Sequence, residues 1–427
     1  MALGFALFLF LLLFGAPIVF ALGVSSLVIL TLVMDVPVAI VAQRLYAGLD
    51  SFTIMAIPFF VIAGLIMDAG GISRRIVALA EALVGWITGS LLLVSVMAAT
   101  GMGAISGSGS ADTAAISSIM QPEIRRRGYD RDFAAAIIAA GGSLAAIIPP
   151  SLLMVVIASI SNISVGALFL AGIVPGLITS AGLLGISYLY ALRAGPQYRA
   201  TTPFDSRTLA RTFVKAIPAM GLPVIIVGGI VGGIFTPTEA AAVAVMYGLV
   251  VGIFVHRELK WTELPRIILR AAAISASVMI ILASASIFSW LIANARVADA
   301  VGELLLQLSS NPATYLLIVN LLLLVVGMFM ESIAAMLILV PVLMPLALKY
   351  GIDPVHFALV VVFNLTIGFI TPPYGIALYV AATVAERGIL QVARKVWLPL
   401  LVMVAVLLLI TYVPAVGMWL PNTFLRP

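Results

Sequence analysis

The sequence predicts an all-α polytopic membrane protein built from two inverted-topology repeats. Hydrophobic residues make up 63% of its 427 residues and charged residues only 9%, whereas soluble proteins average roughly 45–50% and about 25%. The segment 122–150 recurs at 345–373 without a gap. In the membrane topology that the apolar segments imply, most of the basic residues lie on one side of the membrane. Composition, repetition and charge sidedness together support this fold class.

The internal repeat is carried by residue types that an apolar background rarely supplies. Pro, Gly and Asp residues match at constant spacing, and the pairs are Pro122 and Pro345, Gly128 and Gly351, Asp130 and Asp353, Pro149 and Pro372, and Pro150 and Pro373. Because Pro and Gly break helices, matches of this kind indicate a duplication. We therefore divide the chain into a first repeat (1–192), a linker (193–215) and a second repeat (216–427).

Apolar runs define the elements of each repeat. The first repeat contains runs at 3–14, 18–33, 52–67, 91–105, 111–120, 133–160 and 166–192, and the second at 217–235, 240–255, 271–292, 315–330, 333–348, 357–385 and 396–418. The two series match in order. The run at 3–14 has the length of a signal-peptide core, but no Lys or Arg precedes Arg44 and the run has a partner in the second repeat, which favours a retained helix.

The topology follows from the positions of Lys and Arg. We place the N-terminus outside and treat 89–122 and 312–348 as re-entrant hairpins, so that each repeat has five crossings, and an odd number inverts the second repeat. Both termini then lie outside. Of the 22 basic residues, only Arg44, Arg296, Lys349 and Arg426 remain outside, which agrees with the positive-inside rule. Ordinary crossing pairs in place of the hairpins would give the same charge distribution.

Other residues favour re-entrancy. The turn of the first hairpin, from Gly101 to Ser110, is rich in Gly and Ser, too flexible to continue a helix and too polar to face lipid. The descending arm, 111–120, is short of the roughly 20 residues that a crossing needs. An ordinary surface loop is the alternative. Amphipathic stretches at 76–83 and 297–308 precede the hairpins and predict arm helices along the membrane surface.

The two Pro-Pro pairs fall inside long apolar runs and predict broken helices. Each proline removes a backbone donor and frees a carbonyl one turn earlier, and carbonyl oxygens of this kind suit a small hard cation. Polar residues flank the breaks, with Gly141, Gly142 and Ser143 in one repeat and Asn364, Thr366, Gly368 and Thr371 in the other. A proline kink in a packed helix is the alternative. Paired breaks in a duplicated membrane protein are typical of a transporter whose site lies between its repeats.

Carboxylates and hydroxyls gather at the hairpin tips. Ser106, Ser108, Ser110 and Asp112 lie at the first, and Glu331 and Ser332 at the second. A carboxylate in an apolar membrane segment costs on the order of 2.5–3.5 kcal/mol, so Asp112 and Glu331 are candidates for cation or proton coupling. Capping of the following half-helix is the alternative. Half-helices that begin near Ala111 and Ile333 would offer backbone donors to a carboxylate substrate. In the same way, Thr238 is a candidate cap for the helix after Pro237, with Glu239 in its first turn.

At these motifs the chain resembles the large membrane (M) subunit of tripartite ATP-independent periplasmic (TRAP) transporters, within the ion-transporter superfamily. The resemblance covers essentially the whole chain, and the motifs that carry it are Ala56-Ile-Pro-Phe-Phe with Ala63-Gly64, the tip from Ser106 to Thr113, Ile148-Pro-Pro-Ser151, the segment from Gly233 to Ala240, and Ile370-Thr-Pro-Pro373.

The resemblance implies a permease that imports a small organic acid with sodium, by an elevator mechanism, in the bacterial inner membrane. A periplasmic substrate-binding protein would deliver the acid. A small four-helix membrane (Q) subunit would brace the permease, and we expect it to be a separate chain.

Matching motifs imply the sites. Sodium site 1 would comprise Ser106, Ser108, Gly109, Ser110, Gly141, Gly142, Ser143 and Pro149. Sodium site 2 would comprise Glu331, Ser332, Thr366, Gly368, Thr371 and Pro372. The candidates for substrate contact are Ser110, Asp112, Ser151 and Asn364.

Other function classes fit less well. A symporter or antiporter of the same superfamily that works without a binding protein is the nearest rival, and a passive pore would ignore ion gradients. With no Cys and two His, the sequence supplies neither a thiolate metal site nor a nucleophile–base pair, so we do not expect an enzyme. The basic residues lie in loops, where they report orientation, and do not indicate nucleic-acid binding. Lipid and the carboxylate remain as the small-molecule partners.

Overall fold

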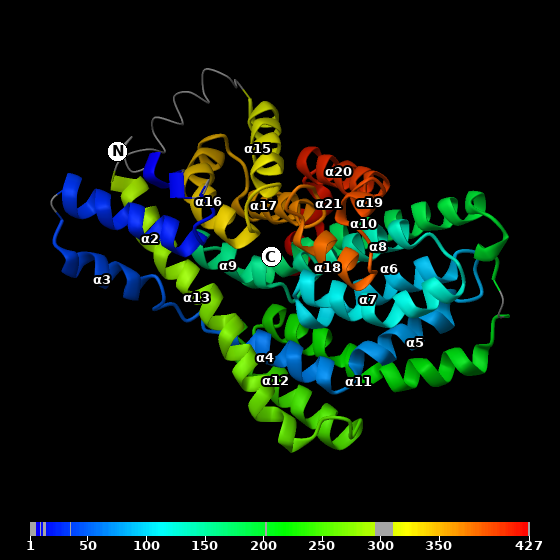
Figure 1. The fold of residues 1–427 in the computed structure, drawn as a ribbon. Coiled ribbons are helices and arrows are strands. Elements are labelled where there is room, and N and C mark those ends of the chain that lie inside the picture. Colours follow the sequence, from blue (N-terminus) through cyan, green and yellow to red (C-terminus); the bar gives the residue numbers. More distant parts are fainter. Residues whose placement is uncertain are drawn as a thin grey trace.

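The computed structural model describes residues 6–8, 10–11, 14–34, 36–200, 203–294 and 311–425. Within these ranges all regular elements are helices, which confirms the all-α prediction (Figure 1). The main helices in chain order are α2 (Ile18–Val28), α3 (Val38–Ala47), α4 (Ala56–Ala69), α5 (Ile72–Val84), α6 (Ser90–Ser106), α7 (Gly109–Arg126), α8 (Arg131–Ser143), α9 (Leu152–Ser161), α10 (Val165–Ala194), α11 (Ser206–Val231), α12 (Pro237–Val250), α13 (Leu264–Asn294), α15 (Pro312–Gly327), α16 (Ser332–Lys349), α17 (Pro354–Gly368), α18 (Ile376–Val384), α19 (Ile389–Ala393), α20 (Trp397–Tyr412) and α21 (Ala415–Phe424).

Helix boundaries in the two halves repeat in the register of the sequence match. The bounds of α7 become those of α16 when 223 is added to each residue number, and the first residue of α8 becomes that of α17. Gly128 and Gly351 both adopt left-handed backbone conformations, the usual end of a helix. Asp130 and Asp353 then cap the next helix, each accepting two backbone N–H groups. The duplicated residues therefore have duplicated local structures.

The two broken helices form the centre of the molecule. All residues of α8 from Phe133 onwards and all residues of α17 from Val355 onwards are buried, as expected for helices that are apolar all round. The chain leaves helical geometry before Pro149-Pro150 and again before Pro372-Pro373, and resumes as α9 and α18. Both Pro-Pro peptide bonds are cis. The predicted helix breaks are confirmed.

The hairpins pack across the two halves. We name α6–α7 hairpin 1 and α15–α16 hairpin 2. Hairpin 1 packs on α8 of its own half, and its second arm also packs on α18 of the other half. Hairpin 2 packs on α17, and its second arm packs on α9. Each hairpin therefore contacts both broken helices.

A second group of helices lies beside this centre. In Figure 1, α13 runs diagonally across the molecule as one long helix, and it contacts α2, α3, α4 and α16. Helix α12 packs closely on α4, and α11 packs on both α12 and α5. The arm helix α5 joins α4 at a bend of 66°. Most of its predicted apolar face is confirmed, because Ile76, Leu79 and Ala80 are buried while Arg74 is exposed, but Leu83 at the end of this face is exposed.

Five described helices are long and apolar enough to cross a membrane alone, namely α10, α11, α12 with its π-helical extension to Val255, α13 with the short turn before it, and α16. Two bent pairs, α4–α5 and α20–α21, would add a span each. This finding supports a multi-pass membrane protein. The inverted arrangement of the repeats remains a prediction.

Several predicted boundaries were wrong. Hairpin 1 does not unwind from Gly101 onwards, because α6 continues to Ser106 and only Gly107 and Ser108 form the turn. Its second arm is an 18-residue helix, not a ten-residue one, and it passes through Pro122. Helix α3 was not expected, and α11 begins at Ser206, inside the predicted linker.

The cap of α12 was also misplaced. Thr236 caps this helix in a reciprocal box with Glu239, whereas the hydroxyl of Thr238 donates to the Phe52 carbonyl. The second amphipathic stretch, 297–308, lies outside the described residues.

Candidate functional site

The tip of hairpin 1 rests against the break between α8 and α9. Gly107 has a positive φ of 62°, and a Cβ there would lie 2.5 Å from the Pro150 carbonyl oxygen. A Cβ on Gly109 would lie 3.3 Å from the Gly142 carbonyl oxygen, and one on Gly142 would collide with Thr113. Glycines therefore allow the tip to approach the carbonyls of the break. The structure brings these predicted site 1 segments together.

Hydroxyl and carboxylate groups organise the same tip. The Ser106 hydroxyl donates to Asp112 Oδ1 at 2.5 Å, and the Ser108 N–H donates to Ser106 Oγ at 3.1 Å. Asp112 is 1% exposed, and its Oδ2 has no hydrogen-bond partner in the part of the chain that the structure describes. An orphaned buried carboxylate oxygen beside a turn of backbone groups is a suitable ligand for a small cation.

Other predicted members of site 1 point elsewhere. The Ser143 hydroxyl donates to the Ala140 carbonyl and lies 4.0 Å from the Met403 sulfur on α20. Gly141 lies against α6, where a Cβ would be 3.0 Å from Ala99. Ser110 is half-buried in the first turn of α7, and Pro149 is buried in the break. The contacts of the Ser143 hydroxyl direct it away from the hairpin tip.

The tip of hairpin 2 is fixed to α17. The Ser332 hydroxyl donates to the Leu365 carbonyl at 3.2 Å, and the Tyr374 N–H donates to the Met328 carbonyl at 3.2 Å. A Cβ on Gly368 would lie 2.6 Å from the Gly327 carbonyl oxygen, so the backbones of α17 and α15 cross closely there. Pro372 lies in the break itself. The predicted site 2 segments are therefore also in contact.

The hydroxyls of site 2 that follow Ser332 have local partners. Thr366 and Thr371 each donate to the carbonyl four residues earlier, at 2.8 and 2.7 Å. Glu331 caps α16 by accepting the Ala334 N–H at 3.1 Å. For Glu331 the capping alternative is therefore correct. For Asp112 it is wrong, since Ser108 holds the cap position and Asp112 bonds Ser106 instead.

The four candidate substrate residues do not share one surface. Asp112 lines a cavity, whereas Ser151 is buried, caps α9 and donates to the Ala146 carbonyl at 2.6 Å. Asn364 is fully buried, and its amide donates to the backbone and side-chain oxygens of Asn320 on α15, both at 3.0 Å. Asn320 in turn donates to Thr411 on α20 at 2.9 Å. Asn364 thus joins hairpin 2 to the centre.

A cavity of about 430 Å³ opens beside hairpin 1. One wall is the tip and one face of α7, including Ser106, Asp112 and Ser118, and the other comes from α4 and α13. Asp68 on α4 and Arg270 on α13 bring opposite charges to it. Its size is within the range of small-molecule sites. The cavity therefore lies between the hairpin and part of the second helix group, although α6 also packs directly on α4 and α5.

Sequence reasoning missed Arg270 as a site residue. We counted it among the loop cations, but it lies in the second turn of α13 and lines the cavity. Its position four residues after Arg266, at the start of an apolar run, was the available signal. The cations at the end of α7 are paired, in contrast to Arg270. Arg126 and Arg127 donate to Glu123, and these hydrogen bonds lower the pKa of the Glu123 carboxyl. Arg270 has no such partner among the described residues.

Comparison with known proteins identifies the family. Residues 5–416 match the family model described as the DctM component of the tripartite ATP-independent periplasmic transporter. The chain belongs to this family. It is therefore the large permease of a TRAP transporter and a multi-pass membrane protein, as the motifs predicted.

Similar proteins include permeases for different acids. The chain is 43% identical over 416 residues to the isethionate TRAP transporter permease protein of Oleidesulfovibrio alaskensis, covering 97% of this chain and 65% of that protein. It is 38% identical over 432 residues to the C4-dicarboxylate TRAP transporter large permease of Rhodobacter capsulatus, covering 98% of both chains. It is also 38% identical over 412 residues to the sialic acid TRAP transporter large permease of Vibrio cholerae, covering 96% of both.

A solved structure supports the fold. The YdaH transporter of Alcanivorax borkumensis superposes with a TM-score of 0.62 over 91% of this chain and 89% of that one. Its sequence identity is only 14%, so the likeness concerns the fold alone.

Proposed function

We propose that this TRAP permease imports a small organic acid together with sodium, in the bacterial inner membrane. The observation that carries the proposal is the contact between each hairpin tip and a broken helix. At hairpin 1 this contact combines the Ser106 hydroxyl, the orphaned oxygen of Asp112 and the carbonyls of Gly142 and Pro150. Sodium is a hard cation that such oxygens can bind. In other transporters, backbone carbonyls of unwound helices coordinate the coupling cation in the same way. Bound there, sodium would supply positive charge beside the substrate.

The cavity supports the binding of an anion. Arg270 provides a cation on one wall, and the first turn of α7 provides backbone N–H groups near Ala111 on the other. A carboxylate placed between them would gain from the guanidinium and from the positive end of the α7 dipole. The named cargoes of the relatives, isethionate, C4-dicarboxylates and sialic acid, are all acids. We therefore infer that the cargo is a small acid.

We infer further that the two repeats are inverted and that transport follows an elevator mechanism. The moving unit would contain the hairpins and broken helices, and α4, α12 and α13 would belong to the fixed unit. The cavity lies between these units and is lined at one end by Asp68 and Arg270, close to the loops that the positive-inside rule places in the cytoplasm. The structure would then correspond to an inward-facing state. A small membrane (Q) subunit and a periplasmic binding protein would complete the system.

Uptake into proteoliposomes tests sodium coupling. The permease would be reconstituted with its small subunit and binding protein, and uptake of a labelled acid measured with an inward sodium gradient. Replacing sodium by potassium should abolish uptake, and Ser106→Ala should raise the sodium concentration needed for half-maximal uptake by about tenfold, since a hydrogen bond to a charged group contributes roughly 1.5–3 kcal/mol.

Thr383→Ala provides the control, because it too removes a hydroxyl that donates a hydrogen bond, here from an exposed residue to the Tyr379 carbonyl outside both sites. It should leave the sodium dependence unchanged. Undiminished uptake in potassium would refute the coupling. Uptake without the binding protein would favour the stand-alone symporter instead.

A further inference from the structure

A second cleft opens between the last turns of α10 and the first turn of α20, away from the cavity beside hairpin 1. It has a volume of about 450 Å³. Its lining comes from both helices and consists of Ile186, Leu189, Tyr190, Arg193, Ala194 and Leu398. Further along, the helices close against each other, since a Cβ on Gly182 would lie 2.5 Å from a methyl group of Val402. The cleft is therefore wedge-shaped and widens towards the end of α10 that carries Arg193.

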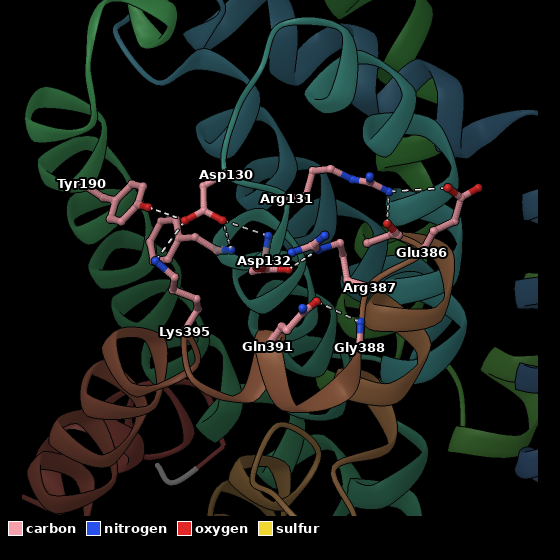
Figure 2. Close-up of polar contacts among 11 residues, drawn as sticks. Asp130, Arg131, Asp132, Tyr190, Glu386, Arg387, Gly388, Gln391 and Lys395 are labelled. Atoms are coloured by element: carbon pink, nitrogen blue, oxygen red, sulfur yellow. Dashed lines mark hydrogen bonds and ion pairs between the residues drawn. The ribbon is translucent and has the colours of Figure 1, made fainter.

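The cleft is preformed by a partly buried polar network. The hydroxyl of Tyr190 donates to Asp130 Oδ2 at 2.7 Å, and Lys395 Nζ lies 3.1 Å from the same oxygen. The ring of Tyr190 stacks on Phe133, with centroids 3.7 Å apart. Figure 2 shows Tyr190 and Lys395 converging on Asp130. This wall of the cleft is consequently held in place without a ligand.

Arg193 differs from two other cations of this region. Lys395 is paired with Asp130, and Arg387 is paired with Asp132 at 2.6 and 2.9 Å. Arg193 lies one turn beyond Tyr190, is exposed and has no ion-pair partner among the described residues. It thus places an uncompensated positive charge at the wide end of an apolar cleft. Leu189, Leu192 and Trp397 around it are more than half exposed.

We propose that this cleft binds an anionic phospholipid, with its phosphate at Arg193 and an acyl chain along Leu189 and Leu398. Helix α10 is a candidate membrane span that ends one residue after Arg193, so Arg193 lies at the level of the headgroups. Basic pockets between membrane helices on the cytoplasmic side bind anionic headgroups, and Trp at this level marks the interface. A phospholipid matches both the charge and the apolar wall, whereas a free phosphate would match only the charge.

Lipid binding to the purified full chain tests the proposal. The probes are dioleoyl phosphatidylglycerol and dioleoyl phosphatidylcholine added in detergent micelles, and native mass spectrometry measures the lipid that remains bound. The wild type should prefer phosphatidylglycerol. Arg193→Gln should weaken phosphatidylglycerol binding about fivefold, the expected effect of one basic residue near the surface.

Two further variants separate a specific site from general charge. Arg211→Gln removes another exposed cation, on α11 and outside the cleft, and should leave binding unchanged. Leu398→Trp fills the cleft but keeps its charge, and should weaken the binding of both lipids. Equal losses of binding with Arg193→Gln and Arg211→Gln, or no lipid preference in the wild type, would overturn the proposal. Displacement of the bound lipid by inorganic phosphate alone would also overturn it. So would a mass spectrum that shows a dimer of the chain without bound lipid.

Discussion

Gly107 is the residue at which the tip of hairpin 1 turns. Its positive φ favours glycine, and the Pro150 carbonyl occupies the space where a side chain would begin. Gly128 provides a comparison within the same half, since it also has a positive φ, but a Cβ added there would meet no atom of the described residues within 4 Å apart from its own chain neighbours. The two glycines share a backbone conformation and differ only in their surroundings.

Alanine substitutions at these two glycines separate backbone strain from displacement of the site. Both should lose stability, by about 1–2 kcal/mol, because the left-handed conformation is unfavourable for a residue with a Cβ. Only Gly107→Ala should also reduce sodium-driven uptake, by at least about tenfold, since the tip must move from the break. Thermal unfolding and proteoliposome uptake measure the two effects. Normal uptake by folded Gly107→Ala would contradict the role of this contact.

The two tip carboxylates show which residue roles a sequence can reveal. Both stood out as charges in apolar segments, and both were candidates for coupling or capping. The structure distinguishes them, because Glu331 is one residue before its helix and Asp112 is four residues into its own. That difference depends on where the helix starts, and the glycine-rich tip obscured the start of α7. The hydrogen bond from Ser106 to Asp112 crosses the turn and could not be deduced from spacing.

At the scale of elements, the sequence predicted the features that depend on local chemistry. The breaks at both Pro-Pro pairs follow from backbone rules and are confirmed. The caps at Asp130 and Asp353 were not predicted, although both residues had been matched in the repeat. The length of α6 was wrong because its glycines do not end the helix but allow close packing, with Gly103 against Ala145 and Gly101 against Ile76. Arg270 and Asp68 were missed as lining of one cavity, because they come from helices that are far apart in the sequence.

Ion pairs connect the first half of the chain to the second at the ends of α7, α8 and α18. Arg387 donates to both oxygens of Asp132, and these side chains are 33% and 16% exposed. Arg125 and Glu386 also pair across the halves, at 3.3 Å, but are 66% and 71% exposed. Figure 2 shows the Arg387–Asp132 pair beside the Asp130 network. The two pairs therefore differ mainly in geometry and exposure.

A double-mutant cycle on each pair tests their contribution to stability. Asp132→Asn and Arg387→Gln should show a coupling energy of about 1 kcal/mol, because a bidentate and partly buried pair retains more of its attraction. Arg125→Gln and Glu386→Gln should show almost none, as is usual for exposed pairs. Thermal unfolding in detergent provides the measurement. Equal coupling in both cycles would mean that burial does not determine the strength of this connection.

At the scale of the whole molecule, the question is whether the cavity beside hairpin 1 opens to one side of the membrane at a time. Ala111 lies near the tip, is exposed and lines the cavity. The chain contains no cysteine, so Ala111→Cys introduces a single thiol into an otherwise unreactive protein. Ala210→Cys on α11 offers a matched control on an exposed surface outside the cavity.

A membrane-impermeant thiol reagent then reports which side reaches the tip. In the absence of sodium and substrate, Ala111→Cys should react from the cytoplasmic side, because the cavity ends near Asp68 and Arg270. With sodium, substrate and binding protein present, its reaction from that side should slow severalfold as the population shifts to outward-facing states. Ala210→Cys should react at the same rate under both conditions. Reaction of Ala111→Cys from both sides at once, independent of sodium, would indicate a continuous pore, and an elevator would then be excluded.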